Sequence, residues 1–249
     1  MGRYIALVPM ALALAACGGG GGGGGGLSLD PVARAAERTS EAGSVRFTMH
    51  LEGGVPSGQY IGFTAHGFSN NADGSGRLSY VFFEAGKPKF HAIAVFDGST
   101  FYMQSKAFAS KLPDGKTWIK ISEKEIKEAG GSLDNAQQGS PTDSLKALRA
   151  AGHTVKVGRG IVAGVPTTKY HTIADLEKEK LADKLGVKRL PVDAWIDGKG
   201  RLRKMTFSVS PSDPTKSGKF SFLLTGFGPA KTVASPPSDQ TVDIRDVMG

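Results

Sequence analysis

The single cysteine of the chain, Cys17, lies where its thiol is expected to take part in covalent chemistry. Arg3 supplies a positive charge near the start, and residues 5–16 form a short apolar stretch that ends in small residues. This order is typical of a signal segment that is cleaved after small residues. The stretch is too short to cross a hydrocarbon core of about 30 Å. We therefore expect cleavage after Ala16, which makes Cys17 the first residue of the mature chain.

The run Leu14-Ala15-Ala16-Cys17 resembles the bacterial lipobox, in which the cysteine thiol is alkylated by diacylglycerol. One acyl chain holds a protein on a membrane marginally, whereas two hold it stably. The resemblance implies a protein anchored by Cys17 on the extracytoplasmic face of a bacterial cell membrane. The alternative is an ordinary secreted protein with an incidental cysteine.

Nine consecutive glycines follow Cys17, from Gly18 to Gly26. Glycine loses the most backbone entropy on ordering, so this run favours a flexible tether over a packed element. We assign residues 1–16 to the signal segment and 17–29 to the lipidated cysteine with its tether. Residues 30–249 are long enough for one domain with a substantial core.

Other residues that could perform chemistry do not form recognisable motifs. The chain has no H-E-x-x-H run, no second cysteine and no G-x-S-x-G elbow. A run at 71–76 begins like a calcium loop, but its twelfth position is Phe82 instead of the required glutamate. Asp193 and Asp197 flank Trp195, and we interpret them as solvated carboxylates. The histidines fall on separate predicted strands or turns: His50, His66, His91, His153 and His171. We expect no catalytic site, no metal site and no cofactor.

The chain is basic, with 31 Lys and Arg against 23 Asp and Glu, a formal net charge of +8. The basic residues are spread along the sequence without a run of five, whereas a nucleic-acid site needs a clustered basic face. Two interpretations stay open: attraction to an anionic membrane surface, or a generic basic surface. Nucleic acid is not an expected partner, and no segment beyond residue 16 is long and apolar enough to span a membrane.

Alternation of apolar and polar residues predicts a long antiparallel meander. Turn sequences such as Asp97-Gly98 and Asp197-Gly198 separate the strands. The expected strands are 45–51, 60–68, 78–83, 89–96, 100–103, 118–121, 155–160, 165–173, 190–196, 201–209 and 219–226.

Cap residues predict four short helices, at 30–42, 122–130, 140–152 and about 175–185. The tail from about residue 229 is rich in Pro and Ser and is expected to be irregular. The fold class is therefore α+β: a highly curved antiparallel half-barrel of strands covered by a few short helices.

Strand parity places apolar side chains on one face of this sheet, and the predicted helices offer little to cover it. Either the sheet curls and fills its interior, or it leaves a cavity for an apolar ligand. The small residues Ala65, Ala92 and Ala94 on this face favour a cavity. The residues expected to line it are Val45, Phe47, Met49, Phe63, Leu78, Tyr80, Phe82, Phe90, Ala92, Ala94, Phe96, Val192, Ala194, Ile196, Met205, Phe207, Phe220, Phe222 and Leu224.

Several short motifs of the later half resemble the mycobacterial LppX/LprG-type lipoproteins and their actinobacterial relatives. They are Trp118-Ile119-Lys120-Ile121, Pro141-Thr142-Asp143-Ser144-Leu145, Gly164-Val165-Pro166-Thr167-Thr168-Lys169-Tyr170, Leu190-Pro191-Val192-Asp193-Ala194-Trp195-Ile196-Asp197 and Gly200-Arg201-Leu202-Arg203-Lys204-Met205. The resemblance spans most of the mature chain.

This resemblance implies a fold like that of the periplasmic lipoprotein carrier LolA, a half-barrel with helices closing over a hydrophobic cavity. It also implies that an acylated lipid or glycolipid is the ligand and that no residue is catalytic. We expect a monomeric carrier, with an envelope transporter as a possible partner. The alternative is a lipoprotein with a filled core that acts through its surface on a sensor or an enzyme.

Overall fold

The computed structural model describes residues 30–54, 60–97, 100–122, 125, 151–175, 187–209 and 217–248. The predicted signal segment, Cys17 and the tether lie outside these residues. So do most residues of the helices predicted at 122–130, 140–152 and 175–185. No helix in the described part of the chain has the length and apolar character that a membrane span requires.

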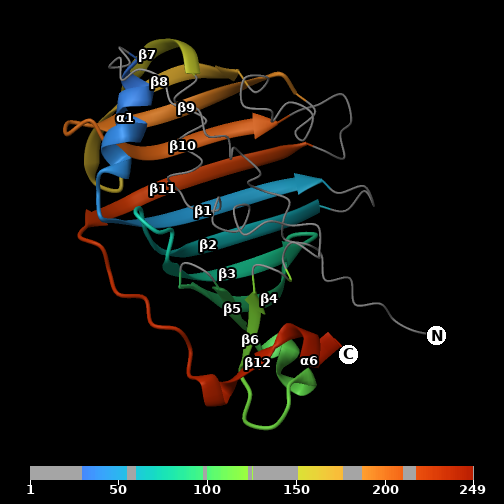
Figure 1. The fold of residues 1–249 in the computed structure, drawn as a ribbon. Helices are drawn as coiled ribbons and strands as arrows, with labels where there is room; N and C mark the ends of the chain where they lie inside the picture. Colours follow the sequence, from blue (N-terminus) through green and yellow to red (C-terminus); the bar gives the residue numbers. More distant parts are fainter. Residues whose placement is uncertain are drawn as a thin grey trace.

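The described strands form one twelve-stranded sheet that curves strongly without closing (Figure 1). Every neighbouring pair is antiparallel except β12 with β6. The order across the sheet is β12 (Thr241–Asp243), β6 (Trp118–Ser122), β5 (Thr100–Gln104), β4 (Lys87–Phe96), β3 (Gly76–Glu84), β2 (Tyr60–Asn70), β1 (Ser44–Gly54), β11 (Gly218–Gly228), β10 (Leu202–Val209), β9 (Arg189–Asp197), β8 (Val165–Asp175) and β7 (Ala151–Val162).

Every predicted strand is present, and the fold is the expected curved, mostly antiparallel sheet with few helices. The pairing of β1 with β11 joins the first and last predicted strands of the meander, with Met49 opposite Phe222. Register shifts interrupt several ladders, as between Arg46 and Phe47 on β1. Such irregularities bend a strand and increase its twist, which helps a wide sheet to curve. Two helix boundaries were wrong: Ala151 belongs to β7, not to the preceding predicted helix, and Asp175 belongs to β8, not to the following one.

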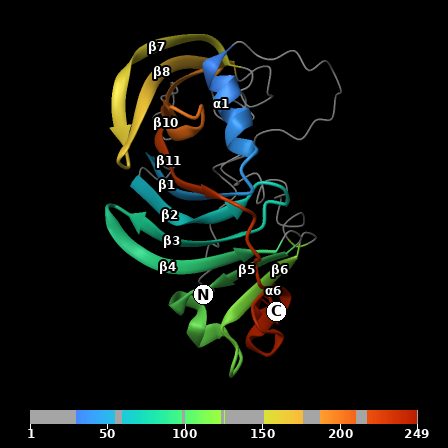
Figure 2. The ribbon, with the colours of Figure 1, turned by 90° about the vertical axis from the view of Figure 1, so that its left-hand side faces the viewer.

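The first predicted helix is present as α1 (Pro31–Ser40), packed against β7, β9 and β10 on one side of the sheet (Figure 2). The Asp30 carboxylate caps it by accepting hydrogen bonds from the backbone N–H groups of Val32 and Ala33. Its buried side chains are small (Val32, Ala33, Ala35, Ala36 and Thr39). Small side chains let the helix approach the sheet closely.

The C-terminal tail is only partly irregular. Residues 229–237 lack regular structure, as predicted, but they are held in place: Asn70 hydrogen-bonds both the carbonyl and the N–H of Lys231. A Cβ on Gly43 would lie 2.4 Å from the backbone nitrogen of Ala230, so only glycine lets the tail cross there.

Beyond residue 237 the prediction of an irregular tail was wrong. A 3₁₀ turn, η4 (Ser238–Gln240), leads into β12, and a short helix, α6 (Ile244–Met248), follows. β12 adds a parallel strand to β6, and Val242 at its centre is buried. Three residues are too few for alternation to reveal a strand.

Two smaller features complete the described fold. A 3₁₀ helix, η2 (Lys106–Lys111), follows β5 and was not predicted. Ser122 and Glu125 make the reciprocal capping-box hydrogen bonds predicted from sequence: the Ser122 N–H donates to the Glu125 carboxylate, and the Glu125 N–H donates to the Ser122 hydroxyl.

Replacing Val242 with Asp should release β12 from β6, because an unpaired charge would be buried at the strand centre at a cost of about 2 kcal/mol or more. Hydrogen exchange should then be faster at the Thr117 amide, which donates to the Gln240 carbonyl. Amides in β1 should keep their protection. The control Val242→Ile should behave like the parent, and unchanged exchange at Thr117 in Val242→Asp would contradict the assignment.

Candidate functional site

The candidate site is the face of the sheet on which α1 lies, which we call the inner face. Registered pairs carry apolar side chains across it from strand to strand, and Figure 2 shows the sheet curving around this side. The row that we call the floor row consists of Ala92, Tyr80, Ala65, Met49, Phe222, Met205 and Ala194, contributed in order by β4, β3, β2, β1, β11, β10 and β9.

The strand registers place every predicted lining residue on the inner face, and most of them belong to one buried cluster. Those less than a tenth exposed are Val45, Phe47, Met49, Phe63, Tyr80, Ala92, Ala94, Val192, Ala194, Ile196, Met205, Phe220, Phe222 and Leu224. Leu78, Phe82, Phe90, Phe96 and Phe207 are half-buried. Their shared role in lining a cavity remains a prediction.

The structure adds residues to this face that were not in the predicted set. Met103 lies beside Ala94, Tyr170 beside Ala194 and Thr172 beside Val192. Alternation in β5 would have identified Met103. Thr172 is fully buried despite its hydroxyl group, which accepts a 2.9 Å hydrogen bond from the Thr154 hydroxyl. Apolar alternation does not identify this position, because threonine is a polar residue type.

Burial changes along the strands. The floor row is almost entirely buried, whereas the next row toward the strand ends is more accessible. This second row, which we call the rim row, consists of Phe90, Phe82, Phe63, Leu51, Phe220 and Phe207. It lies at the end of the sheet away from α1 (Figure 1), because β1 begins directly after α1 and reaches Leu51 near its other end.

The rim row is rich in stacked aromatic rings. The rings of Phe82 and Phe90 stack with centroids 5.5 Å apart, and those of Phe207 and Phe220 stack at 4.7 Å. Tyr80 joins the floor row to the rim row through an edge contact of 6.1 Å with Phe90. Aromatic rings supply a large apolar area with few rotatable bonds. The inner face therefore has a buried floor and an aromatic rim that is only half-buried at four of its six positions.

Tyr80 carries the one hydroxyl group of the floor row. It is 1% exposed, and its hydroxyl donates to the Met103 sulfur at 3.0 Å. Burial disfavours the phenolate and raises the pKa of Tyr80 to about 12. This part of the inner face is therefore an apolar environment.

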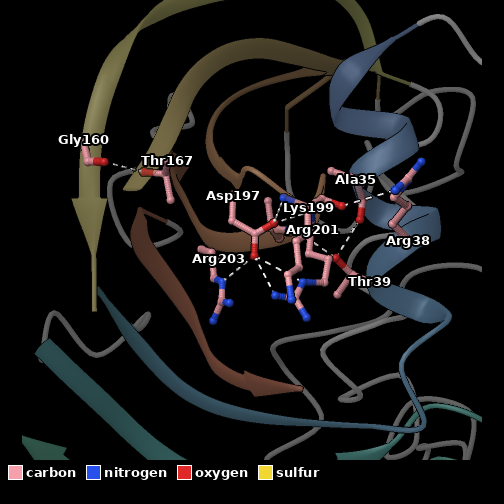
Figure 3. Close-up of polar contacts among 10 residues, drawn as sticks. Ala35, Arg38, Thr39, Gly160, Thr167, Asp197, Lys199, Arg201 and Arg203 are labelled. Carbon is pink, nitrogen blue, oxygen red and sulfur yellow. Dashed lines mark hydrogen bonds and ion pairs between the residues drawn. The ribbon is translucent and has the colours of Figure 1, made fainter. Parts of the chain in front are cut away.

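α1 is fastened to the turn between β9 and β10 (Figure 3). The fully buried Thr39 hydroxyl donates to the Ala35 carbonyl at 2.6 Å and accepts from the Leu202 N–H at 2.9 Å. Arg38 donates to the Lys199 carbonyl at 3.4 Å. The helix thus keeps a fixed position over the β9–β10 part of the inner face.

Asp197 organises the same turn, and its interpretation as a solvated carboxylate was wrong. Its side chain is 3% exposed and accepts hydrogen bonds from Arg201 at 3.0 and 3.2 Å and from Arg203 at 2.9 Å. Burial opposes ionisation, but hydrogen bonds from the Arg201 backbone and from both guanidinium groups outweigh it and lower the pKa of Asp197. Both guanidinium groups also lie over the Phe227 ring, at 4.3 and 4.7 Å.

The opposite side of the sheet, which we call the outer face, carries the polar residues. His50 is hydrogen-bonded to Thr64 and Glu52, and His171 to Asp193 at 2.8 Å. Together with Lys169, His171 lowers the pKa of Asp193, although burial acts in the other direction. His50, Glu52, His171 and Asp193 border an open depression of about 510 Å³.

Among the described residues, no three His, Cys, Asp or Glu side chains are grouped to hold a metal ion. The run at 71–76 is a turn, as predicted. The Asp73 carboxylate accepts from the N–H and the hydroxyl of Ser75, and Gly74 has a φ of +70°.

The architecture is similar to that of solved structures. The crystal structure of LprF from Mycobacterium bovis superposes with a TM-score of 0.51 at 14% sequence identity, covering 84% of this chain and 96% of that one. The crystal structure of the Mycobacterium tuberculosis lipoprotein LppX gives a TM-score of 0.49 at 17% identity, covering 82% and 100%. The chain therefore shares the fold of LprF, which confirms the resemblance to LppX/LprG-type proteins at the level of the fold.

In sequence, the chain is 27% identical over 250 residues to an uncharacterised 31.2 kDa protein of Streptomyces griseus from the rplA–rplJ intergenic region. The match covers 88% of this chain and 80% of that protein. No protein-family model matches the chain.

Replacing Tyr80 with Phe should remove a phenol ionisation near pH 12 from an alkaline absorbance titration. The folded pKa of Tyr80 is raised to about 12, so its contribution to stability is complete below the unfolded value of 10 and is lost as pH rises toward 12. Tyr80→Phe should abolish this part of the alkaline loss of stability. The control Tyr170→Phe should leave the late ionisation in place, and a Tyr80→Phe curve that still shows it would contradict the assignment.

Replacing Asp197 with Asn should destabilise the fold at neutral pH by about 3 kcal/mol, since it leaves the largely buried Arg203 guanidinium without its carboxylate. The folded pKa of Asp197 is lowered, so its stabilisation is present above the unfolded value and is lost as pH falls through the folded one. Urea unfolding should show the difference from the parent shrinking in acid. The control Asp193→Asn, at a more exposed carboxylate on the same strand, should cost at most about 1 kcal/mol. An Asp197→Asn difference that does not change with pH would refute this role.

Proposed function

We propose that this protein is a non-enzymatic, membrane-anchored carrier that binds the acyl chains of a lipid against its inner face. The observation that carries the proposal is the apolar inner face itself, continuous from β4 to β9, with a buried floor and a half-buried aromatic rim. An acyl chain needs apolar contact along its whole length, and this face offers it without interruption. The ligand class is an acylated lipid or glycolipid.

The dimensions of the face suit such a ligand. The rim row crosses six strands, so at a spacing of about 4.8 Å between strands it extends about 24 Å along the curve. Half of a hydrocarbon core of about 30 Å, the length that one acyl chain fills, is about 15 Å. A chain lying across the strands would therefore find apolar side chains along its whole length.

The energetics favour exchange over irreversible capture. Each methylene exposed to water costs about 0.8 kcal/mol, so free diffusion of a long-chain lipid is strongly disfavoured. Transfer from a bilayer to an apolar protein face exchanges one apolar environment for another, and the net free energy can remain near zero. Anchoring through Cys17 would keep the carrier close to its source membrane and raise its effective concentration there. A membrane transporter that accepts the lipid is a natural partner of such a monomeric carrier.

Three further observations support the proposal. The fold shared with LprF agrees with the sequence resemblance to LppX/LprG-type lipoproteins. That resemblance implies a lipid ligand. The sequence up to Cys17 has the order of a lipoprotein signal. The buried carboxylate of Asp197 is paired with arginines in a structural role, which leaves it unsuited to act as a catalytic base.

Native mass spectrometry tests the proposal directly. The chain with Cys17→Ser, purified from a membrane-containing host, should retain a lipid of defined mass and should take up a fluorescent fatty acid when delipidated. Absence of lipid together with absence of uptake would favour the alternative of a filled core that acts through its surface.

Replacing Ala92 with Trp should separate a cavity from a filled core. Ala92 is 1% exposed in the floor row between the Tyr80 strand and β5. If the floor lines a lipid cavity, the indole occupies that space and uptake of the fluorescent fatty acid falls at least tenfold while the unfolding temperature is maintained. In a filled core the same change overpacks the interior and costs about 1–3 kcal/mol or more. The control Val81→Trp, on the outer face of the neighbouring strand, should leave uptake unchanged.

A further inference from the structure

The exposed apolar side chains of this protein are concentrated in one hairpin. Among the described residues, all the large hydrophobic side chains that are prominently exposed belong to β7 and β8. Ile161 is 76% exposed, Val155 56%, Val157 55% and Ile173 37%. Monomeric soluble proteins seldom gather exposed apolar side chains in one place unless the surface binds something.

The same hairpin is basic. Lys156 lies between the exposed Val155 and Val157 on β7, Arg159 follows two residues later, and both cations are exposed. Within residues 151–175, Lys169 is a third cation, although it is paired with Asp193 of β9 at 2.8 Å, and Asp175 is the only carboxylate. Exposed apolar side chains interleaved with cations match an anionic bilayer surface, where the former enter the interface and the latter meet lipid phosphates.

The basic and apolar character continues onto the adjacent outer face. Trp195 lies between the ammonium groups of Lys169 and Lys204, each 4.9 Å from its ring centre. Ile161 and Lys204 border a shared depression of about 300 Å³ beneath the end of the hairpin. Tryptophan and lysine side chains are typical of membrane interfaces.

The geometry of β7 disfavours a peptide strand as its partner. β7 is an edge strand of the sheet, but its ladder with β8 is shifted twice, between Gly152 and Val155 and between Lys156 and Gly158. Register shifts and charged side chains are devices that prevent an edge from adding another strand. A bilayer surface requires no such regular edge.

The position of the hairpin also fits a membrane. The hairpin forms the edge of the sheet beside α1 (Figure 2), and α1 packs against β7. About 13 residues separate Cys17 from Asp30, so the two are at most about 45 Å apart in a fully extended chain. A bilayer that holds the acylated Cys17 would therefore be within reach of the hairpin.

We propose that the β7–β8 hairpin is a second, reversible contact with the membrane, specific for anionic lipid surfaces. The side chains of Val155, Val157 and Ile161 enter the interface, and Lys156 and Arg159 contact lipid phosphates. This membrane contact deepens the proposed function. It rests on that function only in one respect: a lipid carrier must approach a bilayer. The two contacts together orient the sheet relative to the membrane.

Vesicle co-sedimentation of the chain with Cys17→Ser, which removes the acyl anchor, tests this contact. The protein should bind vesicles of phosphatidylcholine mixed with phosphatidylglycerol, and this binding should weaken with salt and with pure phosphatidylcholine. Lys156→Gln with Arg159→Gln should lower partitioning by about 30-fold, a factor of about five for each cation. Val155→Thr, Val157→Thr and Ile161→Thr together should lower it by about 100-fold while keeping the β-branched side chains that suit a strand.

A matched control distinguishes binding through the hairpin from an effect of the net positive charge of the protein. Lys106→Gln with Lys111→Gln removes the same charge from the exposed η2 segment, which follows β5 in the opposite half of the sheet, and should leave partitioning within about twofold. Equal losses at η2 and at the hairpin would overturn the proposal, as would hairpin variants that bind vesicles like the parent. Self-association through β7, seen as a dimer that the threonine variants dissolve, would also overturn it.

Fatty acid uptake without vesicles distinguishes this inference from the proposed function. The hairpin variants should take up the fluorescent fatty acid as the parent does, whereas Ala92→Trp should lose uptake and still bind vesicles. If the parent fails to take up the fatty acid, the proposed carrier function is contradicted and the hairpin contact is unaffected. If the parent fails to bind vesicles, the hairpin contact is contradicted and the carrier function is unaffected.

Discussion

The structure depends on one constraint: a wide sheet with one apolar face must keep that face away from water. Antiparallel registers carry the side chains of the floor row across β4, β3, β2, β1, β11, β10 and β9, so that no strand breaks the apolar surface. Curvature brings these rows toward each other, and α1 covers the part over β9 and β10. The same constraint underlies the proposed function, because an apolar face that must be covered suits the acyl chain of the proposed ligand.

Covering the face requires a helix in a fixed position, and buried polar groups provide it. The Thr39 hydroxyl and the Asp197 carboxylate are both nearly inaccessible. Thr39 joins α1 to the start of β10, and Asp197 holds the β9–β10 turn and that strand through Arg201 and Arg203. Buried polar groups are costly unless they are satisfied, so they specify one arrangement of the helix on the sheet. The apolar surface supplies most of the burial, and these few hydrogen bonds determine where the helix lies.

The two faces of the sheet separate two kinds of contact. Apolar groups on the inner face are buried or half-buried, and the rim row gives them limited access at the end of the sheet away from α1. Exposed apolar groups occur instead on the β7–β8 hairpin, beside cations. This division agrees with a protein that holds acyl chains on the inside of its curve and meets a lipid surface with one edge.

The residue pattern predicts eleven of the twelve strands, α1 with its Asp30 cap, and the parity that places residues such as Phe47, Met49 and Phe222 on one face. These features follow from local periodicity and capping chemistry, which act over a few residues. Three features follow from the folded sheet instead: β1 pairs with β11, β12 extends the sheet in parallel, and Asp197 is buried between two arginines. Each of these joins segments or side chains whose partners are set by how the whole sheet curves, and local pattern contains no information about that geometry. The graded burial of the inner face, from the floor row to the rim row, belongs to the same class, since it depends on how side chains from distant strands pack against each other.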